Sequence, residues 1–273
     1  MDRGQAMESL FGAPRALIGV VHLAALPGTP HGGLAVAEIA ARAVADARAY
    51  HAAGFDALIL ENMHDCPYLK GSVGPEIVAA MTLAGSEVRR AVPLPLGVQV
   101  LAAANTEALA VAHAIGAGFV RVEGFVFAHV ADEGVIESSA GALLRYRKAI
   151  GAAGVRVFAD IKKKHSAHAI TADVDLAETA RAAEFFGADA VIVTGVATGR
   201  ETDPADVAAA RAAAGIPVLV GSGITAANLA RYDAADGLIV GSSAKLDGAW
   251  SNPVDEARAR ALSRNFKSRR SSL

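Results

Sequence analysis

The sequence predicts an α/β fold, a single (β/α)₈ TIM barrel, and three observations support this. Eight short apolar runs alternate with eight alanine-rich stretches of helical character. Several runs are almost uninterrupted, such as LIGVV (17–21) and DAVIV (189–193), which is typical of parallel strands buried on both faces. The length of 273 residues suits one such barrel, because α/β barrels often reach about 250 residues as one domain.

The predicted strands are short and rich in Val, Ile and Leu. They span residues 16–22, 57–61, 96–100, 119–123, 155–160, 190–194, 218–221 and 237–240. An open, doubly wound sheet is the alternative arrangement of such units. Eight regular repeats favour the closed barrel.

The predicted helices follow the strands in strict alternation. They span residues 35–53, 75–92, 105–117, 141–153, 173–186, 203–214, 225–232 and 253–266. Pro75 suits a first helical turn, Asn105 an N-cap, and Gly54 a stop. Most strand-to-helix connections are longer than the helix-to-strand ones. The carboxyl-terminal face of the barrel, where barrel enzymes carry their active sites, therefore receives the long loops.

Composition excludes several classes of protein. Hydrophobic residues make up 53% of the chain and charged residues 20%, too apolar for a disordered chain. No uncharged apolar run reaches the roughly 18–20 residues of a membrane span, and the start lacks the apolar core of a secretory signal. The single Cys66 excludes an internal disulfide. We expect a cytoplasmic protein.

A net charge of −2 argues against a nucleic-acid partner. We expect one domain with a core at about 14–266, a short amino-terminal lead and a mobile basic tail at 267–273. The outer helices are rich in alanine and could pack against another subunit, so a homo-oligomer is compatible with the sequence.

Two segments predict a phosphate site. VLVGSGIT (218–225) and GLIVGSSAK (237–245) each run from an apolar strand into Gly-Ser and a helix start. Glycine lets a ligand approach the backbone, and helix N-termini attract anions. Barrel phosphate sites are often built after strands seven and eight. Ordinary turns are the alternative. The predicted phosphate-binding residues are Gly221, Ser222, Gly223, Gly241, Ser242 and Ser243.

The end of the fifth strand, FADIKKKHS (158–166), predicts catalytic residues. If Asp160 points into the barrel mouth, the two-residue period of a strand carries Lys162 and Lys164 the same way for as long as the strand continues. An Asp–Lys pair can shuttle a proton, a lysine can form a Schiff base, and His165 can assist. A solvated basic loop capped by Asp160 is the alternative.

Other polar residues end neighbouring strands and predict contacts to substrate. Glu61, Glu123 and Asp160 could converge on a divalent cation such as Mg²⁺. Structural ion pairs with Arg121 or the lysines explain the same acids. The glycine-rich loop 194–203 suits a lid or ligand clamp, and the loop after the second strand suits a cover over the substrate. The predicted substrate-binding residues are His22, Asn62, Gln99, Thr194 and Gly195.

Together, several segments resemble the BtpA/SgcQ family. They are ALIGVVHLAALPGTP (16–30), FDALILENMHDCPY (55–68), FADIKKKHS (158–166), VIVTGVATGRETD (191–203), VGSGITAANLARY (220–232) and ADGLIVGSSAKLDGAWSNPVD (235–255). The resemblance implies a ribulose-phosphate-binding-like barrel. The family name carries a role in photosystem I biogenesis, and some members are described as nucleosidases or sugar-metabolism enzymes. Gln99 and Glu123 depart from the family pattern, which implies a different ligand.

These observations favour an enzyme acting on a small phosphorylated sugar or nucleoside-derived metabolite, of isomerase, epimerase or lyase type. A nucleosidase-type hydrolase is the hydrolytic alternative. The alternative from another class is a non-catalytic biogenesis factor for a membrane complex. The charged strand ends favour the enzyme, since a factor without catalysis has no need of them.

Overall fold

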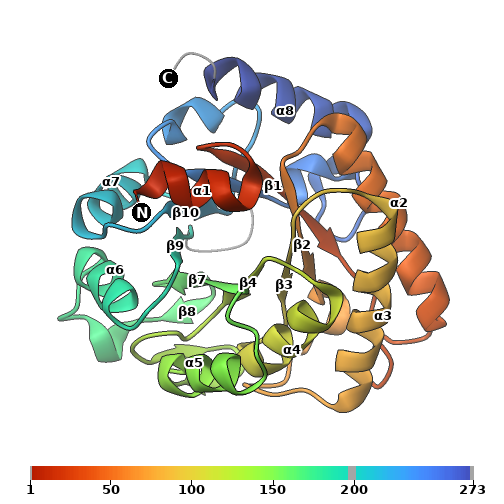
Figure 1. The fold of residues 1–273 in the computed structure, drawn as a ribbon, viewed down its shortest axis with the longest axis horizontal. Coiled ribbons are helices and arrows are strands. Elements are labelled where there is room, and N and C mark those ends of the chain that lie inside the picture. Colours follow the sequence, from red (N-terminus) through yellow and green to blue (C-terminus); the bar gives the residue numbers. More distant parts are fainter. Residues whose placement is uncertain (1, 196–200, 271–273) are drawn as a thin grey trace.

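The computed structural model describes residues 2–195 and 201–270. Eight parallel strands close into a barrel in the order β1-β11-β10-β9-β7-β4-β3-β2 (Figure 1). The predicted barrel is therefore confirmed. Its strands are β1 (Ala16–His22), β2 (Ala57–Glu61), β3 (Leu96–Gln99), β4 (Phe119–Val122), β7 (Arg156–Ile161), β9 (Ala190–Val193), β10 (Val218–Gly221) and β11 (Gly237–Val240).

Helices surround the barrel, and most match the sequence prediction. They are α2 (Val36–Ala53), α3 (Pro75–Ala91), α4 (Asn105–Ile115), α5 (Ala140–Ala149), α6 (Leu176–Phe185), α7 (Pro204–Ala213) and α8 (Glu256–Arg270). The helix predicted at 225–232 is wrong, because this segment forms a loop and only a short 3₁₀ turn, η3 (Leu229–Tyr232). The Asn228 side chain bonds to the backbone of Gly223 and Thr225, and such local bonds compete with a helix.

Short 3₁₀ turns interrupt several of the loops. They are η1 (Met63–Asp65), η2 (Ala169–Thr171), η4 (Ser242–Ala244) and η5 (Leu246–Gly248). Two of them, η4 and η5, lie between the last barrel strand and α8. This connection is therefore a structured segment, which later contributes to the site.

The amino-terminal segment forms a helix, α1 (Arg3–Phe11), which lies across one end of the barrel (Figure 1). Asp2 and Gln5 form a capping box that fixes its start. Met7 and Phe11 are buried in the same cluster as the inward-facing Phe119 and Phe158. The helix therefore closes the amino-terminal end of the barrel, which the prediction of a short lead missed.

Packing inside the barrel depends on matching small and large residues. Phe119 and Phe158 stack with ring centroids 4.8 Å apart, and Phe11 meets Phe119 edge-on. A side chain on Gly97 would collide with the Phe119 ring at 2.3 Å. Glycine on one strand therefore makes room for a phenylalanine on the next.

A small antiparallel sheet lies outside the barrel, in the order β6-β5-β8. Its strands are β5 (His129–Ala131), β6 (Gly134–Ile136) and β8 (Ser166–Ala167). Two of them come from the connection after β4, and the third follows β7. Strands of two or three residues carry too few positions for a readable alternation, so the sequence did not reveal this sheet.

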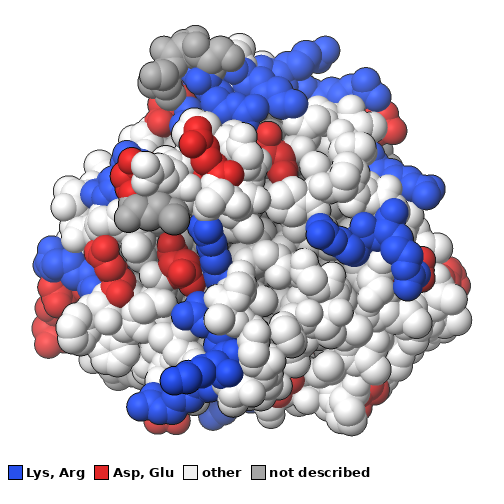
Figure 2. All heavy atoms as spheres, in the orientation of Figure 1, with Lys and Arg blue, Asp and Glu red and all other residues white. Residues whose placement is uncertain are grey.

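The carboxyl-terminal segment is helical through Arg270, whereas the sequence predicted a mobile tail from residue 267. Arg269 pairs with Asp233 and Arg270 with Asp56. Figure 2 shows Lys and Arg gathered over α8. Arg258 and Arg260 also pair with acids at the start of this helix, which favours a role for these cations in stabilising the helix. Within the described ranges, no helix has the length and apolar character to cross a membrane.

Candidate functional site

A cavity of about 260 Å³ opens where the carboxyl ends of the barrel strands meet their loops. The registers of β10 and β11 pair Gly221 with Ile239, so the two Gly-Ser turns leave the barrel side by side. All six predicted phosphate-binding residues line this cavity: Gly221, Ser222, Gly223, Gly241, Ser242 and Ser243. We call it the first cavity. The predicted α-helix starts are absent here, because the turns lead into a loop and a short 3₁₀ turn.

The first turn is held in a fixed backbone conformation. Ser222 and Gly223 both have positive φ angles, 147° and 66°. Residues other than glycine rarely adopt this region. Asn228 donates to the carbonyl of Gly223 at 2.7 Å, and Ser243 donates to the carbonyl of Ile224. The hydroxyl of Ser222 accepts a bond from the Gly195 amide at 3.0 Å. These bonds tie the turns after β9, β10 and β11 together.

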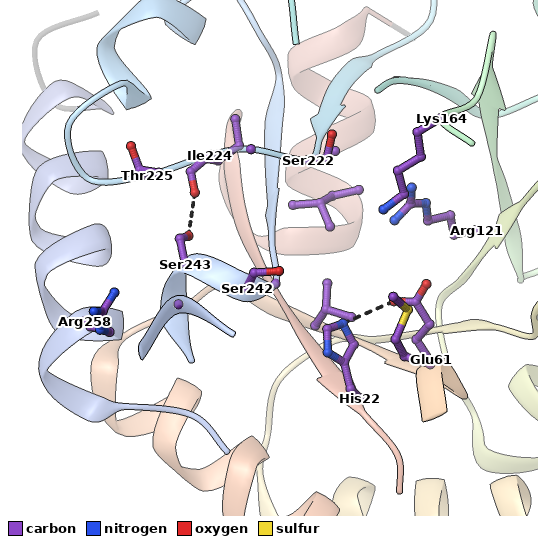
Figure 3. Close-up of a pocket in the computed structure, with 17 residues that line it drawn as sticks. His22, Glu61, Arg121, Lys164, Ser222, Ile224, Thr225, Ser242, Ser243 and Arg258 are labelled. Carbon is purple, nitrogen blue, oxygen red and sulfur yellow. Dashed lines mark hydrogen bonds and ion pairs between the residues drawn. The ribbon is translucent and has the colours of Figure 1, made fainter. Parts of the chain in front are cut away.

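Cationic side chains stand at both ends of the first cavity. In Figure 3, Arg258 lies on the α8 side, and Lys164 and Arg121 lie on the opposite side. The serines of the two turns lie between them. A cavity with glycines, hydroxyls and cations along its wall suits an anionic group such as phosphate.

His22 and Glu61 form a pair at the ends of β1 and β2. His22 Nδ1 donates to the carbonyl of Trp250 at 2.8 Å, since a carbonyl oxygen can only accept. This bond directs Nε2 toward Glu61 Oε2 at 3.5 Å (Figure 3). Burial raises the pKa of Glu61, but the hydrogen bond and charge of His22, with nearby cations, outweigh it and lower the pKa to about 2. Glu61 is thus a carboxylate facing an imidazole.

Asp160 lies apart from the main cavities. Its carboxylate accepts two bonds from Arg121, at 3.0 Å from Nε and 2.9 Å from Nη2. It lines a small separate cavity of about 20 Å³, room for one water. Arg121 lines the first cavity. The geometry therefore makes Asp160 a partner of Arg121, in agreement with the ion-pair alternative.

The three lysines after β7 point in different directions. Lys162 has a positive φ of 47°, which ends the strand alternation, and its ammonium donates to the carbonyl of Thr171. Lys163 is buried and pairs with Glu123 at 3.2 Å. Only Lys164 reaches the first cavity. Because the strand ends at Ile161, its two-residue period does not extend to Lys162 and Lys164, which line different cavities.

Lys164 is half-buried at the edge of the site. Burial, followed by the charge of Arg121, lowers the pKa of its ammonium, and the nearby carboxylates offset this only in part. Its backbone amide donates to the hydroxyl of Thr194 at 2.9 Å. Lys164 is therefore a positioned amine with a raised neutral fraction.

A second cavity, of about 310 Å³, adjoins the first. Both are lined by Glu61, Met63, Arg121 and Lys164. Gln99, Glu123 and His165 line only the second cavity. Burial raises the pKa of Glu123, although the Lys163 charge opposes this shift. A ligand in either cavity would therefore meet the same charged residues, Glu61, Arg121 and Lys164.

The predicted Mg²⁺ trio does not form. Glu61 pairs with His22, Glu123 with Lys163 and Asp160 with Arg121. Among the residues that the structure describes, no three His, Cys, Asp or Glu side chains gather closely enough to hold a metal ion. Each acid of the trio already has a partner of its own on the protein, so these residues do not fit a divalent ion.

Three predicted substrate-binding residues lie behind the cavities. Asn62 donates to Asp65 at 2.8 Å and accepts from the amide of Leu101 at 2.7 Å, which joins the loops after β2 and β3. Thr194 and Gly195 hold the backbone of Lys164 and the side chain of Ser222. Their contacts make them positioning residues. Residues 196–200 of the predicted lid lie outside the described residues.

Sequence reasoning missed Trp250 and Arg258 as site residues. Both follow β11, where the chain passes through η4 and η5 before α8 begins. The long connection brings the Trp250 carbonyl to His22 and the Arg258 side chain to the first cavity. The sequence offered one signal for Trp250, which is that the only tryptophan of the chain lies in a polar loop.

Comparison with known proteins agrees with the fold and the motifs. The model of the BtpA family matches residues 13–268. The chain belongs to the BtpA family. An uncharacterized mitochondrial protein of Caenorhabditis elegans is 45% identical over 258 residues, covering 92% of this chain and 93% of the relative. The Synechocystis relative, named photosystem I biogenesis protein BtpA, is 37% identical over 92% of this chain and 88% of its own.

Solved structures of other proteins are similar to this chain in fold. Phosphoribosyl anthranilate isomerase from Thermus thermophilus matches with a TM-score of 0.57 and 16% identity, over 93% of this chain and 98% of that chain. An identity this low shows the fold alone. The BtpA family member described here therefore shares a TIM barrel with that enzyme, and its activity has to be inferred from its own side chains.

Proposed function

We propose that the protein is an enzyme acting on a small phosphorylated sugar or a related phosphorylated metabolite, of isomerase, epimerase or lyase type. One observation carries the proposal. The first cavity joins an anion-binding end, made by the turns after β10 and β11, to a titratable end, made by His22, Glu61 and Lys164. A phosphate at one end would hold the sugar with its reacting carbons at the other.

The anion-binding end combines neutral and charged groups. The glycines leave the backbone accessible, the hydroxyls of Ser222 and Ser242 flank the opening, and Arg258 adds a cation from α8. Arg258 is about half exposed, so it can adjust to an incoming anion. Such groups bind a phosphate chiefly through charge-assisted hydrogen bonds.

The titratable end supplies a base and an acid. Lys164, with its lowered pKa, would take a proton from a carbon next to a carbonyl. His22, oriented by Trp250, would protonate the carbonyl oxygen, and the Glu61 carboxylate would stabilise the imidazolium. Arg121, held by Asp160, would stabilise the developing oxyanion. Lys164 could instead form a Schiff base in a carbon–carbon lyase.

A nucleosidase-type hydrolase is the second candidate. Glu61 and Glu123 both line the second cavity, where a carboxylate could activate water or stabilise an oxocarbenium ion. The third candidate is a non-catalytic biogenesis factor, as the name of the Synechocystis relative describes that protein. The charges buried at the barrel mouth favour an enzyme over such a factor, because buried charges are unfavourable and packing alone would not select them.

A binding measurement tests the anion-binding end. We expect inorganic phosphate and pentose 5-phosphates to raise the unfolding temperature, since a ligand at a hundred times its Kd stabilises the native state by about 2.7 kcal/mol. Gly223→Asp should abolish the shift by placing a carboxylate in the cavity. Gly116→Asp is the matched control, because Gly116 is exposed, has a positive φ of 67° like that of Gly223, and a Cβ added there would meet no heavy atom within 4 Å. Absence of binding by every phosphate compound contradicts the proposal.

Proton exchange tests the chemistry even when the product is unidentified. A bound sugar phosphate incubated in D₂O should lose the proton next to its carbonyl, seen as a vanishing ¹H NMR signal. Lys164→Met should stop the exchange while phosphate still binds. Release of a free base from a nucleoside 5′-monophosphate, without such exchange, would identify the hydrolase instead. Binding without either reaction would support the non-catalytic factor.

A further inference from the structure

We infer that the second cavity is a subsite for a planar ring that carries N–H donors and is attached to the sugar of the phosphorylated substrate. This inference rests on the proposed function, since it extends the ligand of the first cavity. In this subsite Gln99 and Glu123 accept hydrogen bonds from the ring, and Trp250 and Tyr68 form part of the wall around it. The substrate class is thereby narrowed to sugar phosphates with an N-linked ring, and nucleoside 5′-monophosphates, whose sugar has no carbonyl, serve as binding probes for this class.

The strongest observation is an unsatisfied acceptor. Gln99 is 2% exposed and lines the second cavity. No described residue donates a hydrogen bond to its buried Oε1. A buried amide oxygen without a partner loses its hydration and gains nothing in return, so native proteins rarely leave one. A donor on the ligand would satisfy it.

A second acceptor lies on the next strand connection. Glu123 directly follows β4, and β4 pairs with β3, which ends in Gln99. Glu123 Oε2 is buried and lies 3.2 Å from the Lys163 ammonium, but it accepts no aligned hydrogen bond from the described residues. Two acceptors that lack a hydrogen-bond donor belong to residues lining one cavity, and they favour a ligand group that carries donors.

The rest of the wall combines an apolar and aromatic part with charged side chains, among them Arg121, Lys163 and Lys164. Met63, Leu101 and Ala102 line the cavity together with the aromatic Tyr68 and Trp250. The Tyr68 hydroxyl already donates to the carbonyl of Met63 at 2.8 Å, so its ring is held in place. Trp250 is packed against His64 with ring centroids 4.9 Å apart. Apolar and aromatic walls with a few fixed polar atoms are typical of sites for flat rings.

The position of the cavity fixes how the ring is attached. The two cavities share Glu61, Arg121 and Lys164, so a ligand that fills both must pass its middle over these residues. With phosphate in the first cavity and the ring in the second, the sugar and its bond to the ring lie over the titratable groups. The bond between sugar and ring is therefore placed at the reacting centre.

Calorimetric titration with matched probes tests the subsite. The probes are ribose 5-phosphate, which lacks the ring, and adenosine and guanosine 5′-monophosphate, which carry N–H donors on an N-linked ring. At least one nucleotide should bind about tenfold more tightly than ribose 5-phosphate. Gln99→Met, of similar volume but without the acceptor, should reduce this advantage to about threefold or less. It should leave the Kd of ribose 5-phosphate unchanged.

Tyr68→Ala provides a second variant in case Gln99→Met fails to fold, because Tyr68 is only partly buried and lines only the second cavity. It should also remove the advantage of the nucleotide and leave ribose 5-phosphate binding intact. If both nucleotides bind no better than ribose 5-phosphate, or bind equally well to both variants, the subsite is overturned and the proposed function stands. If ribose 5-phosphate and inorganic phosphate fail to bind, the proposed function fails. Adenosine and guanosine binding that depends on Gln99 would then support the subsite alone.

Discussion

The two ends of the barrel use the same architecture for opposite purposes. At the amino-terminal end, Phe119 and Phe158 fill the interior and α1 adds Met7 and Phe11 above them. At the carboxyl-terminal end, inward positions carry charged residues that are just as deeply buried: Glu61, Arg121, Glu123, Asp160 and Lys163. Apolar packing stabilises the first end, whereas the second end is organised by ion pairs that have to offset a desolvation penalty.

The comparison shows where charged groups lie within reach of a ligand. Three of the buried acids have a specific partner: His22 for Glu61, Arg121 for Asp160 and Lys163 for Glu123. The ammonium of Lys164 has neither an ion pair nor a hydrogen bond to any described residue, although it faces both cavities. A charged group that the structure positions but does not pair is available to a ligand.

The largest effect on stability is expected at the packed end. Phe119→Ala removes a fully buried ring that contacts Phe11 and Phe158, and should lower the free energy of unfolding by about 3–5 kcal/mol. The Kd of inorganic phosphate at 25 °C should stay within a factor of two, because the cavity lies at the other end. Urea denaturation and calorimetry measure the two quantities. A large loss of phosphate affinity in the folded variant would show that the two ends are coupled.

The largest effect on turnover is expected at the charged end. Lys164→Met should lower kcat for the substrate found by the binding panel by about 10²–10³-fold, the range of a general base. Stability should change little, since no ion pair is lost. In the wild type kcat should rise with pH through the lowered pKa of Lys164, because only the neutral amine accepts a proton. An unchanged kcat and pH profile in Lys164→Met would exclude this lysine as the base.

Sequence patterns predicted the barrel well for a physical reason. Strands buried on both faces leave uninterrupted apolar runs, as in 17–21 and 189–193. The Gly-Ser turns were predicted as neighbours because strand order in a barrel brings β10 and β11 together. Bringing the six predicted phosphate-binding residues to one cavity therefore needed only local patterns and the closure of the barrel.

The details of the charged end were not predictable in the same way. The positive φ of Lys162 breaks the alternation that would have paired it with Lys164, and nothing in KKK distinguishes the three side chains. The bidentate contact of Arg121 with Asp160 joins residues 39 positions apart. Trp250 and Arg258 reach the site through a connection without regular helix or strand. Such contacts depend on tertiary structure.

A smaller effect concerns how the free energy of unfolding decreases at acidic pH. Glu61 has a native pKa of about 2 against an ordinary value of 4.5. Because its native pKa is depressed, its contribution is fully present above pH 4.5 and is lost as the pH falls toward 2. Between pH 5 and pH 3 the loss should be about 2 kcal/mol. Glu61→Gln should show a correspondingly flatter decline of the unfolding free energy, measured by urea denaturation. If the unfolding free energy of Glu61→Gln declined as steeply as that of the wild type, other carboxylates would be responsible for the loss of stability in acid.

The smallest expected effect concerns the contribution of Arg258 to the affinity for phosphate. Arg258 is about half exposed and pairs only distantly with Asp255, at 3.8 Å, so solvent and salt weaken its field. Arg258→Gln should raise the Kd of inorganic phosphate about threefold at 0.15 M salt. The effect should grow at lower ionic strength, because screening decreases there. Arg264→Gln, a change of the same charge on the same helix away from the lining of the cavity, is the control. Equal effects of the two substitutions would mean that α8 acts through its overall charge, whereas an effect of Arg258 alone supports direct contact with the anion.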